Sequence, residues 1–186
     1  MNNMKSKTAF LVVDMINDYL APKGKKYCAP CRSIIPDLKR LIGLARGNDW
    51  PVIYVSTCLE DGQGPLAGKW GMHARKGTWG AEIVPELKPL AGDIMVAKTV
   101  YDGFFETDLD KILKKLKIST VVVTGIHTHV CVLLTALGAF YRGYRVIVVR
   151  EGMTTDKQIN HDTRLPFFET HLGQLLSLDD FVARFG

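Results

Sequence analysis

Residues 120–143 read TVVVTGIHTHVCVLLTALGAFYRG, and this stretch places an expected strand directly before an expected helix. Residues 120–125 form a short run of mainly β-branched residues that ends at Gly125, which is typical of a buried strand. Residues 128–142 are expected to be helical, with Gly143 as the C-terminal stop. A buried strand followed by a helix is the repeating unit of α/β proteins.

The same unit recurs along the chain. Further strands are expected at residues 8–13, 51–57, 94–98, 145–149 and, as a short sixth strand, 175–177. Further helices are expected at residues 33–46, 107–116 and 162–172, with Ser33 as the N-cap of the first. Continuous apolar strands that alternate with helices indicate a parallel sheet covered on both faces, so we predict a doubly wound α/β fold. Residues 58–92 are rich in Gly and Pro, and a loop of that length is usually functional or disordered.

Length and composition predict a single domain spanning residues 1–186. Of the 186 residues, 47% are hydrophobic and 23% charged, as in an ordinary globular domain with one core. The net charge of +5 comes from scattered Lys and Arg residues, which argues against a nucleic-acid partner. The opening residues, MNNMKSK, do not resemble a signal peptide, and no apolar run is long enough to cross a bilayer. We therefore expect a cytoplasmic protein with no membrane partner.

Three chemically active side chains follow expected strands. Asp14 follows the strand at 8–13, Lys98 ends the strand at 94–98, and Cys131 lies in the first turn of the helix after residues 120–125. The carboxyl ends of parallel strands meet at one edge of a sheet, where function collects. The helix N-terminus and Lys98 are expected to lower the pKa of Cys131, while Asp14 holds the thiol proton. Free N–H groups of the same turn would receive an oxyanion, so the pattern predicts acyl transfer through a thioester.

Each of these side chains also has an ordinary structural explanation. Buried cysteines are commonly inert, a strand-end aspartate is often a cap, and a strand-end lysine often points to solvent. Their convergence at one sheet edge favours catalysis. A non-catalytic binding module on the same fold remains the alternative.

The sequence YCAPCR at residues 27–32 resembles the redox centre of thioredoxins. A long loop separates Cys28 from the first expected strand, however, and no later segment resembles the cis-proline loop of that fold. We expect the pair of Cys28 and Cys31 to be incidental to catalysis, as a surface disulfide or as zinc ligands shared with a neighbouring subunit. A thiol–disulfide oxidoreductase is the alternative function that this motif leaves open.

Four segments together resemble the isochorismatase-like cysteine hydrolases, which include nicotinamidases and N-carbamoylsarcosine amidases. They are LVVDMINDYL at 11–20, WGMHARKGTWGAEIVPEL at 70–87, KTVYDGFFETDLDKIL at 98–113 and VVVTGIHTHVCVLLTA at 121–136. The resemblance extends over about residues 8–181, and the order and separation of the segments make it specific. It implies a three-layer α/β/α sandwich with a six-stranded, mostly parallel sheet, assembled as a homodimer or homotetramer.

The resemblance also implies roles for individual residues. Cys131 corresponds to the nucleophile, Asp14 to the general base and acid, and Lys98 to the third member of the triad. A cis peptide bond is implied at Ile126–His127, which would turn N–H groups near Cys131 towards the substrate carbonyl. The implied reaction is cleavage of a C–N bond in a small amide or ureido compound, with release of ammonia. Isochorismatase-type hydrolysis of a vinyl ether is the alternative within the family.

The metal site of nicotinamidases is not expected here. The resemblance implies that nicotinamidases bind their metal through an Asp-x-His pair and a later histidine. His73 fits the later position, but Glu60 and Asp61 stand where the pair belongs, with no histidine near them. We therefore expect no metal and no cofactor.

Five residues are expected to bind substrate, with plain core packing as the equal alternative for the aromatic ones and a hydrogen-bonded loop position as the preferred alternative for His73. His129 is expected to cap a helix or face solvent. The substrate-binding set is Tyr19, Trp70, His73, Phe104 and His127.

Overall fold

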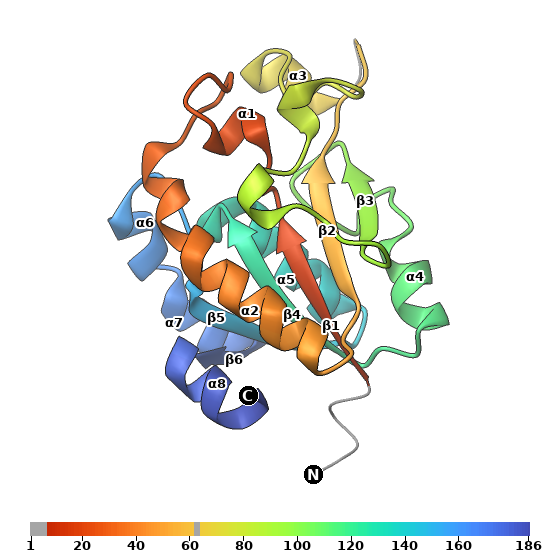
Figure 1. The fold of residues 1–186 in the computed structure, drawn as a ribbon, viewed down its shortest axis with the longest axis vertical. Helices are drawn as coiled ribbons and strands as arrows, with labels where there is room; N and C mark the ends of the chain where they lie inside the picture. The colour runs from red at the N-terminus through yellow and green to blue at the C-terminus, as the bar shows by residue number, and fades with distance from the viewer. Residues whose placement is uncertain (1–6, 62–63) are drawn as a thin grey trace.

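The computed structural model describes residues 7–61 and 64–186, and its centre is a six-stranded sheet in the order β3-β2-β1-β4-β5-β6 (Figure 1). The strands are β1 (Thr8–Val13), β2 (Val52–Thr57), β3 (Ile94–Lys98), β4 (Thr120–Ile126), β5 (Arg145–Thr154) and β6 (Gly173–Leu176). Every neighbouring pair is parallel. Because β1 and β4 lie at the centre and the chain winds outwards from them in both directions, the predicted doubly wound α/β fold is confirmed.

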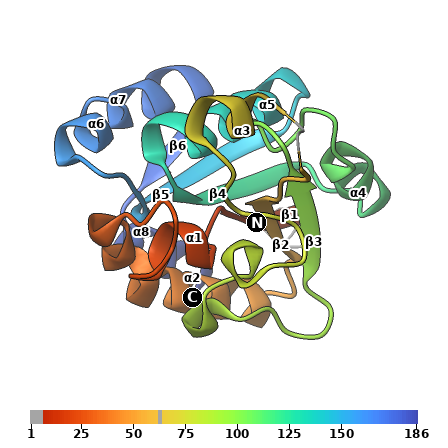
Figure 2. The same cartoon turned by 90° about the horizontal axis from the view of Figure 1, so that it is seen from above.

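Helices cover both faces of the sheet (Figure 2). One face carries α2 (Ile35–Gly47) and α8 (Leu178–Phe185). The opposite face carries α4 (Leu109–Lys115), α5 (Leu133–Tyr141), α6 (Gln158–Asp162) and α7 (Leu165–Phe167). The short helices α1 (Asn17–Leu20) and α3 (Pro65–Trp70) stand beyond the carboxyl ends of the strands, at the top of Figure 1.

Side chains of the central strands alternate between two apolar cores. In β1, Phe10 and Val12 pack into the core under α2 and α8, whereas Leu11 and Val13 pack into the core under α5. Every residue of β1 and of β4 is buried. A strand that is covered on both faces contains no polar half, which explains why these segments are continuous apolar runs in the sequence.

Several predicted helix boundaries are wrong. A 3-10 turn at Ala29–Ile34 precedes α2, so its N-cap is Ile34 rather than the predicted Ser33. The helix predicted at 128–142 begins with a π-helical turn, Thr128–Val132, and only then becomes α5. The helix predicted at 162–172 is divided, because Pro166 lacks the N–H that a helix interior needs and lies in the first turn of α7.

The long segment between β2 and β3 packs over the edge of the sheet where the strands have their carboxyl ends. It contains α3 and two 3-10 turns, Trp79–Ala81 and Pro85–Leu87. The buried Asp18 carboxylate accepts hydrogen bonds from the N–H groups of Ala74 (2.7 Å) and Lys25 (3.1 Å). A Cβ on Gly80 would lie 2.5 Å from that carboxylate, so glycine allows the close approach. No helix within the described ranges is long and apolar enough to cross a bilayer.

Candidate active site

Asp14 occupies the first position after β1 and has an unusual backbone conformation. Its φ of 56° lies in the left-handed region, which costs a residue with a side chain about 1 kcal/mol. The residue is 1% exposed, and its Oδ1 accepts a hydrogen bond of 2.6 Å from the N–H of Thr57 at the end of β2. The neighbouring strand therefore holds this carboxylate in one orientation, inside the protein.

Lys98 reaches the same point from the edge of the sheet. It ends β3, and its side chain passes over β2 to place Nζ 2.7 Å from Asp14 Oδ2. The ammonium also donates to Thr57 Oγ1 (3.0 Å) and to the Val100 carbonyl (3.2 Å). Burial alone would lower the pKa of Lys98, but the attraction of the Asp14 carboxylate opposes burial, and the pKa is raised. Lys98 and Asp14 thus form a buried ion pair in which each charge compensates the other.

Cys131 approaches this pair from the turn after β4. Gly125 pairs with Val13 in the sheet and has a φ of 105°, and a Cβ there would lie 2.1 Å from the Val13 carbonyl oxygen. Only glycine allows the chain to leave β4 so close to Asp14. The following peptide bond, Ile126–His127, is cis, at the position that the family resemblance implied. Sequence reasoning therefore placed Asp14, Lys98 and Cys131 at one sheet edge, and the structure brings them together.

The predicted low pKa of Cys131 is wrong. Burial raises the pKa of this thiol to about 12, although Lys98 lowers it. The cysteine also lies in the π-helical turn before α5, rather than in the first turn of a regular helix. In the unliganded protein Cys131 is therefore a neutral thiol, and any nucleophilic role requires that its proton be removed during attack.

A cavity of about 430 Å³ opens above Cys131. Four of the five predicted substrate-binding residues line it, namely Tyr19, Trp70, His73 and His127. Phe104 does not, and its prediction is wrong. The Gly103 N–H donates to Thr135 Oγ1 on α5, which draws this segment to the far side of the sheet. There the Phe104 ring is 3% exposed and stacks on Tyr144.

Tyr19 and His73 form a fixed part of the cavity wall. His73 Nδ1 donates to the Gly71 carbonyl (2.7 Å), so His73 Nε2 accepts the hydrogen bond of 2.9 Å from the Tyr19 hydroxyl. Burial, with the nearby charge of Asp14, raises the pKa of Tyr19. His73 is thus both a buried, hydrogen-bonded loop residue and a cavity residue. Trp70 is more exposed, and its Nε1 donates to the Tyr101 hydroxyl (2.8 Å).

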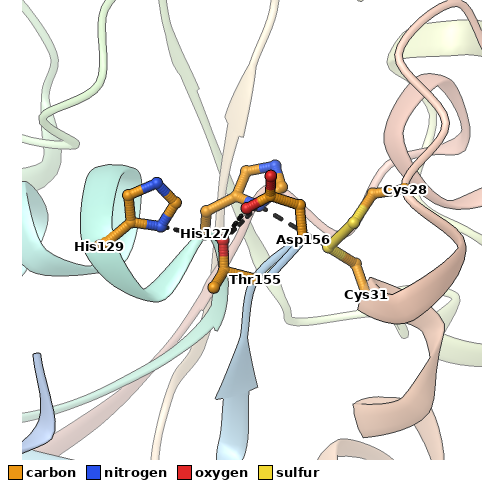
Figure 3. Close-up of a disulfide and its surroundings, with 6 residues drawn as sticks. All are labelled: Cys28, Cys31, His127, His129, Thr155 and Asp156. Carbon is orange, nitrogen blue, oxygen red and sulfur yellow. Dashed lines mark hydrogen bonds between the residues drawn. A yellow bond between two sulfur atoms is a disulfide. The ribbon is translucent and has the colours of Figure 1, made fainter. Parts of the chain in front are cut away.

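Sequence reasoning missed a polar group beside the cavity (Figure 3). Thr155 Oγ1 lies 2.9 Å from His129 Nδ1, 3.2 Å from His127 Nδ1 and 2.9 Å from Asp156 Oδ1, to which it donates. His129 is partly exposed and also lines the cavity, a position that sequence reasoning did not assign to it. The signal that could have found Thr155 and Asp156 was the carboxyl end of β5, which continues to Thr154 instead of ending at residue 149.

The Cys28–Cys31 pair forms a disulfide in the same cavity wall. Cys28 is 8% exposed and Cys31 is fully buried, so the predicted surface disulfide is a buried one. Cys31 Sγ lies 3.7 Å from His127 Nδ1 (Figure 3). The two cysteines at the 3-10 turn before α2 are therefore neighbours of the turn that carries Cys131.

The fold and this cluster define an α/β protein with a buried thiol and a buried carboxylate–ammonium pair where parallel strands end. The chain belongs to the isochorismatase family, because a family model described as an isochorismatase domain matches residues 8–180. This assignment confirms the resemblance seen in the four sequence segments.

Individual relatives agree with the family assignment. The ureidoacrylate amidohydrolase of Variovorax paradoxus is 31% identical over 97% of this chain and 82% of its own length. An isochorismatase-like hydrolase from Alkaliphilus metalliredigens is 32% identical, with a TM-score of 0.91 over 97% of this chain and all of its own. N-carbamoylsarcosine amidase from Thermoplasma acidophilum is 33% identical, with a TM-score of 0.83 over 93% of this chain and 97% of its own.

Proposed function

We propose that this chain, as one catalytic domain, is a cysteine hydrolase that cleaves a C–N bond in a small amide or ureido compound and releases ammonia. The observation that carries the proposal is the buried Asp14–Lys98 ion pair beside the Cys131 thiol at the base of a cavity. A buried ion pair seldom stabilises a fold more than apolar side chains of the same size would. Its position next to a thiol and an open cavity gives it a chemical use instead.

In the first half of the reaction the thiol becomes an acyl carrier. Cys131 Sγ attacks the substrate carbonyl carbon while its proton passes to Asp14, whose two oxygens each keep a lone pair beyond their bonds to Thr57 and Lys98. N–H groups of the turn at 127–131 receive the oxyanion, and the Lys98 ammonium stabilises the added negative charge. Asp14 then returns the proton to the leaving nitrogen, so that ammonia departs and a thioester remains.

The second half restores the enzyme. A water molecule attacks the thioester carbon while Asp14 accepts a proton from it. The C–S bond breaks, and the proton returns to the Cys131 sulfur as the acid product leaves. Each proton that Asp14 accepts is given back within the same half-reaction, so the buried ion pair with Lys98 is re-formed twice in each cycle.

The activities for which two relatives are named support ureido and carbamoyl compounds as the substrate class. One relative is named for ureidoacrylate and another for N-carbamoylsarcosine. The wall that Tyr19, Trp70 and His73 supply is aromatic and holds fixed hydrogen-bonding groups, as small-molecule sites commonly do.

The test is ammonia release from a panel of ureidoacrylate, N-carbamoylsarcosine and nicotinamide. The native protein, Cys131→Ala and Cys58→Ala are compared, because Cys58 is the free cysteine outside the cavity. We expect release by the native protein and by Cys58→Ala, and none by Cys131→Ala. Release that survives in Cys131→Ala would remove the thioester from the proposal. Isochorismate is tested alongside the panel with pyruvate as the measured product, because turnover of this compound alone would favour vinyl-ether hydrolysis.

The disulfide does not favour a redox enzyme. A protein partner in thiol–disulfide exchange must reach a sulfur atom, whereas Cys31 is fully buried and Cys28 is 8% exposed in the wall of a cavity of small-molecule size. The proposal also includes a cytoplasmic location, which cell fractionation would test. It further includes assembly as a homodimer or homotetramer, which sedimentation analysis of the purified chain would test.

A further inference from the structure

A second cluster of reactive side chains lies in the cavity wall, and the reaction proposed above does not use its sulfur atoms. The Sγ atoms of Cys28 and Cys31 and the Nδ1 atom of His127 all lie within 4.8 Å of one another. Figure 3 shows the disulfide directed at the His127 ring. Two thiols separated by two residues, with a histidine nearby, are the ligand types and the spacing that tetrahedral zinc sites use.

We propose that, once the disulfide is reduced, Cys28, Cys31 and His127 form a binding site for Zn²⁺ in the wall of the cavity. A dithiol reductant supplies the two electrons: its own two thiols become a disulfide, while Cys28 and Cys31 become thiols. Binding of Zn²⁺ then releases the two thiol protons to solvent, and Nδ1 of His127 offers its lone pair with the ring proton on Nε2. Oxidation of the two cysteines removes two of the three ligands, so the disulfide and the metal exclude each other.

The charge balance of this site suits its buried location. Two thiolates and a neutral imidazole around a divalent cation have no net charge, so the complex avoids the cost of burying an unpaired ion. Cys31 is fully buried and Cys28 is 8% exposed, and an isolated thiolate at either position would lack such compensation. The reduced pair therefore has an electrostatic reason to bind a cation rather than remain as two thiolates.

His127 can leave its present partner at little cost. The Thr155 hydroxyl has one hydrogen and three polar neighbours, and His127 Nδ1 is the most distant of them at 3.2 Å. When the metal takes Nδ1, Thr155 keeps Asp156 as its acceptor and His129 as its donor. The His127 ring needs to move only a little to share a metal ion with Cys31, because its Nδ1 already lies 3.7 Å from Cys31 Sγ.

Three protein ligands leave the fourth tetrahedral position for water or for a molecule in the cavity. Cys28, His127 and Cys131 line the same cavity, so this open position faces the space where a substrate would lie. The site is distinct from the nicotinamidase ligand set that the sequence lacks around Glu60, Asp61 and His73. Two of its three ligands, Cys28 and Cys31, are residues that the sequence analysis expected to be incidental to catalysis.

Cobalt titration of the full-length protein tests the proposal without reference to activity. The protein is reduced with dithiothreitol without oxygen, freed of reductant and titrated with Co²⁺, whose ligand-field and thiolate charge-transfer absorption reports tetrahedral sulfur ligation. Zinc retained after dialysis is then measured by elemental analysis. We expect stoichiometric binding by the reduced protein and none by the oxidised protein.

Matched variants identify the ligands. The double variant Cys28→Ser/Cys31→Ser should abolish thiolate charge transfer at the site. His127→Ala should weaken binding by more than about 100-fold, because even partners of ligands contribute 10–100-fold. His129→Ala changes a histidine that shares Thr155 but lies outside the cluster, and Cys58→Ser changes a thiol outside it, so both should bind as the native chain does.

Three results would overturn the proposal. The first is absence of binding by the reduced native chain, including the case in which circular dichroism shows that reduction unfolds it. The second is charge transfer that persists in Cys28→Ser/Cys31→Ser, which would place the metal at other thiols. The third is equal loss of affinity in His127→Ala and His129→Ala, which would remove His127 as a specific ligand.

Discussion

Two sulfur-containing regions border the same cavity, and they are held together by different forces. Cys131 lies beside Asp14 and Lys98, and these three residues come from the ends of three different strands. The buried opposite charges of Asp14 and Lys98 hold that pair in place. Cys28 and Cys31 are neighbours in sequence and are joined by a covalent bond. The pair that is more conspicuous in the sequence lies in the wall of the cavity, whereas the group suited to hydrolysis is assembled by the fold from distant segments.

The largest effect should come from removal of the Cys131 sulfur. We expect Cys131→Ala to lower kcat/KM by roughly 10⁴-fold or more, as the loss of a nucleophile does in other hydrolases. The unfolding midpoint should change little, since alanine fills most of the same space. Steady-state kinetics on the best substrate of the ammonia-release panel measure the effect. Activity within tenfold of the native value would assign the chemistry to another group.

The next effect concerns stability as well as activity. Lys98→Met leaves the Asp14 carboxylate buried without its cation, which should lower the free energy of unfolding by about 3–5 kcal/mol and abolish turnover. Urea denaturation measures the loss. The matched control is Lys76→Met, which removes an exposed lysine paired with Glu60 and should leave the midpoint unchanged. Similar urea midpoints for both variants would show that the buried ion pair contributes no more to stability than the exposed one.

Removal of the disulfide should affect stability more than chemistry. The double variant Cys28→Ala/Cys31→Ala opens a very short loop, for which the chain-entropy relation gives about 2 kcal/mol of lost stability. We expect kcat/KM to stay within about tenfold of the native value, which corresponds to 1.4 kcal/mol in the barrier. Kinetics in the presence of a chelator measure this. A loss as large as that of Cys131→Ala would place the disulfide in the catalytic machinery.

The smallest effect is a pH dependence of stability. His161 is buried and lies 2.9 Å from Thr128 Oγ1 in the turn that carries Cys131, and burial lowers its pKa below the usual 6.5. Below about pH 6.5 the unfolded chain therefore binds a proton that the folded chain resists, so stability should fall as the pH falls. His161→Gln should flatten the profile between pH 7 and 5 in thermal unfolding experiments. An unchanged slope would assign it to other groups.

Much of the fold could be predicted because buried parallel strands are continuous apolar runs. The same pattern placed Asp14, Lys98 and Cys131 at strand ends, and the order of the strands then brought them together. The pKa of Cys131 could not be predicted, because its direction depends on how completely the surrounding chain excludes water. The positions of Phe104 and Thr155 depended on which side of the sheet a connection follows and on where a strand ends, and neither has a clear signal in local sequence.

The position of Lys98 has a consequence for how the protein loses activity on heating. Its strand, β3, is the edge of the sheet, while Asp14 lies on the central β1. Edge strands open locally at a lower free energy than the core needs for global unfolding. Each opening of β3 would withdraw the ammonium from Asp14 while the other strands stay folded. Heat inactivation should therefore begin below the global melting temperature and reverse on cooling, because local opening of the edge strand disables the site before the rest of the protein unfolds.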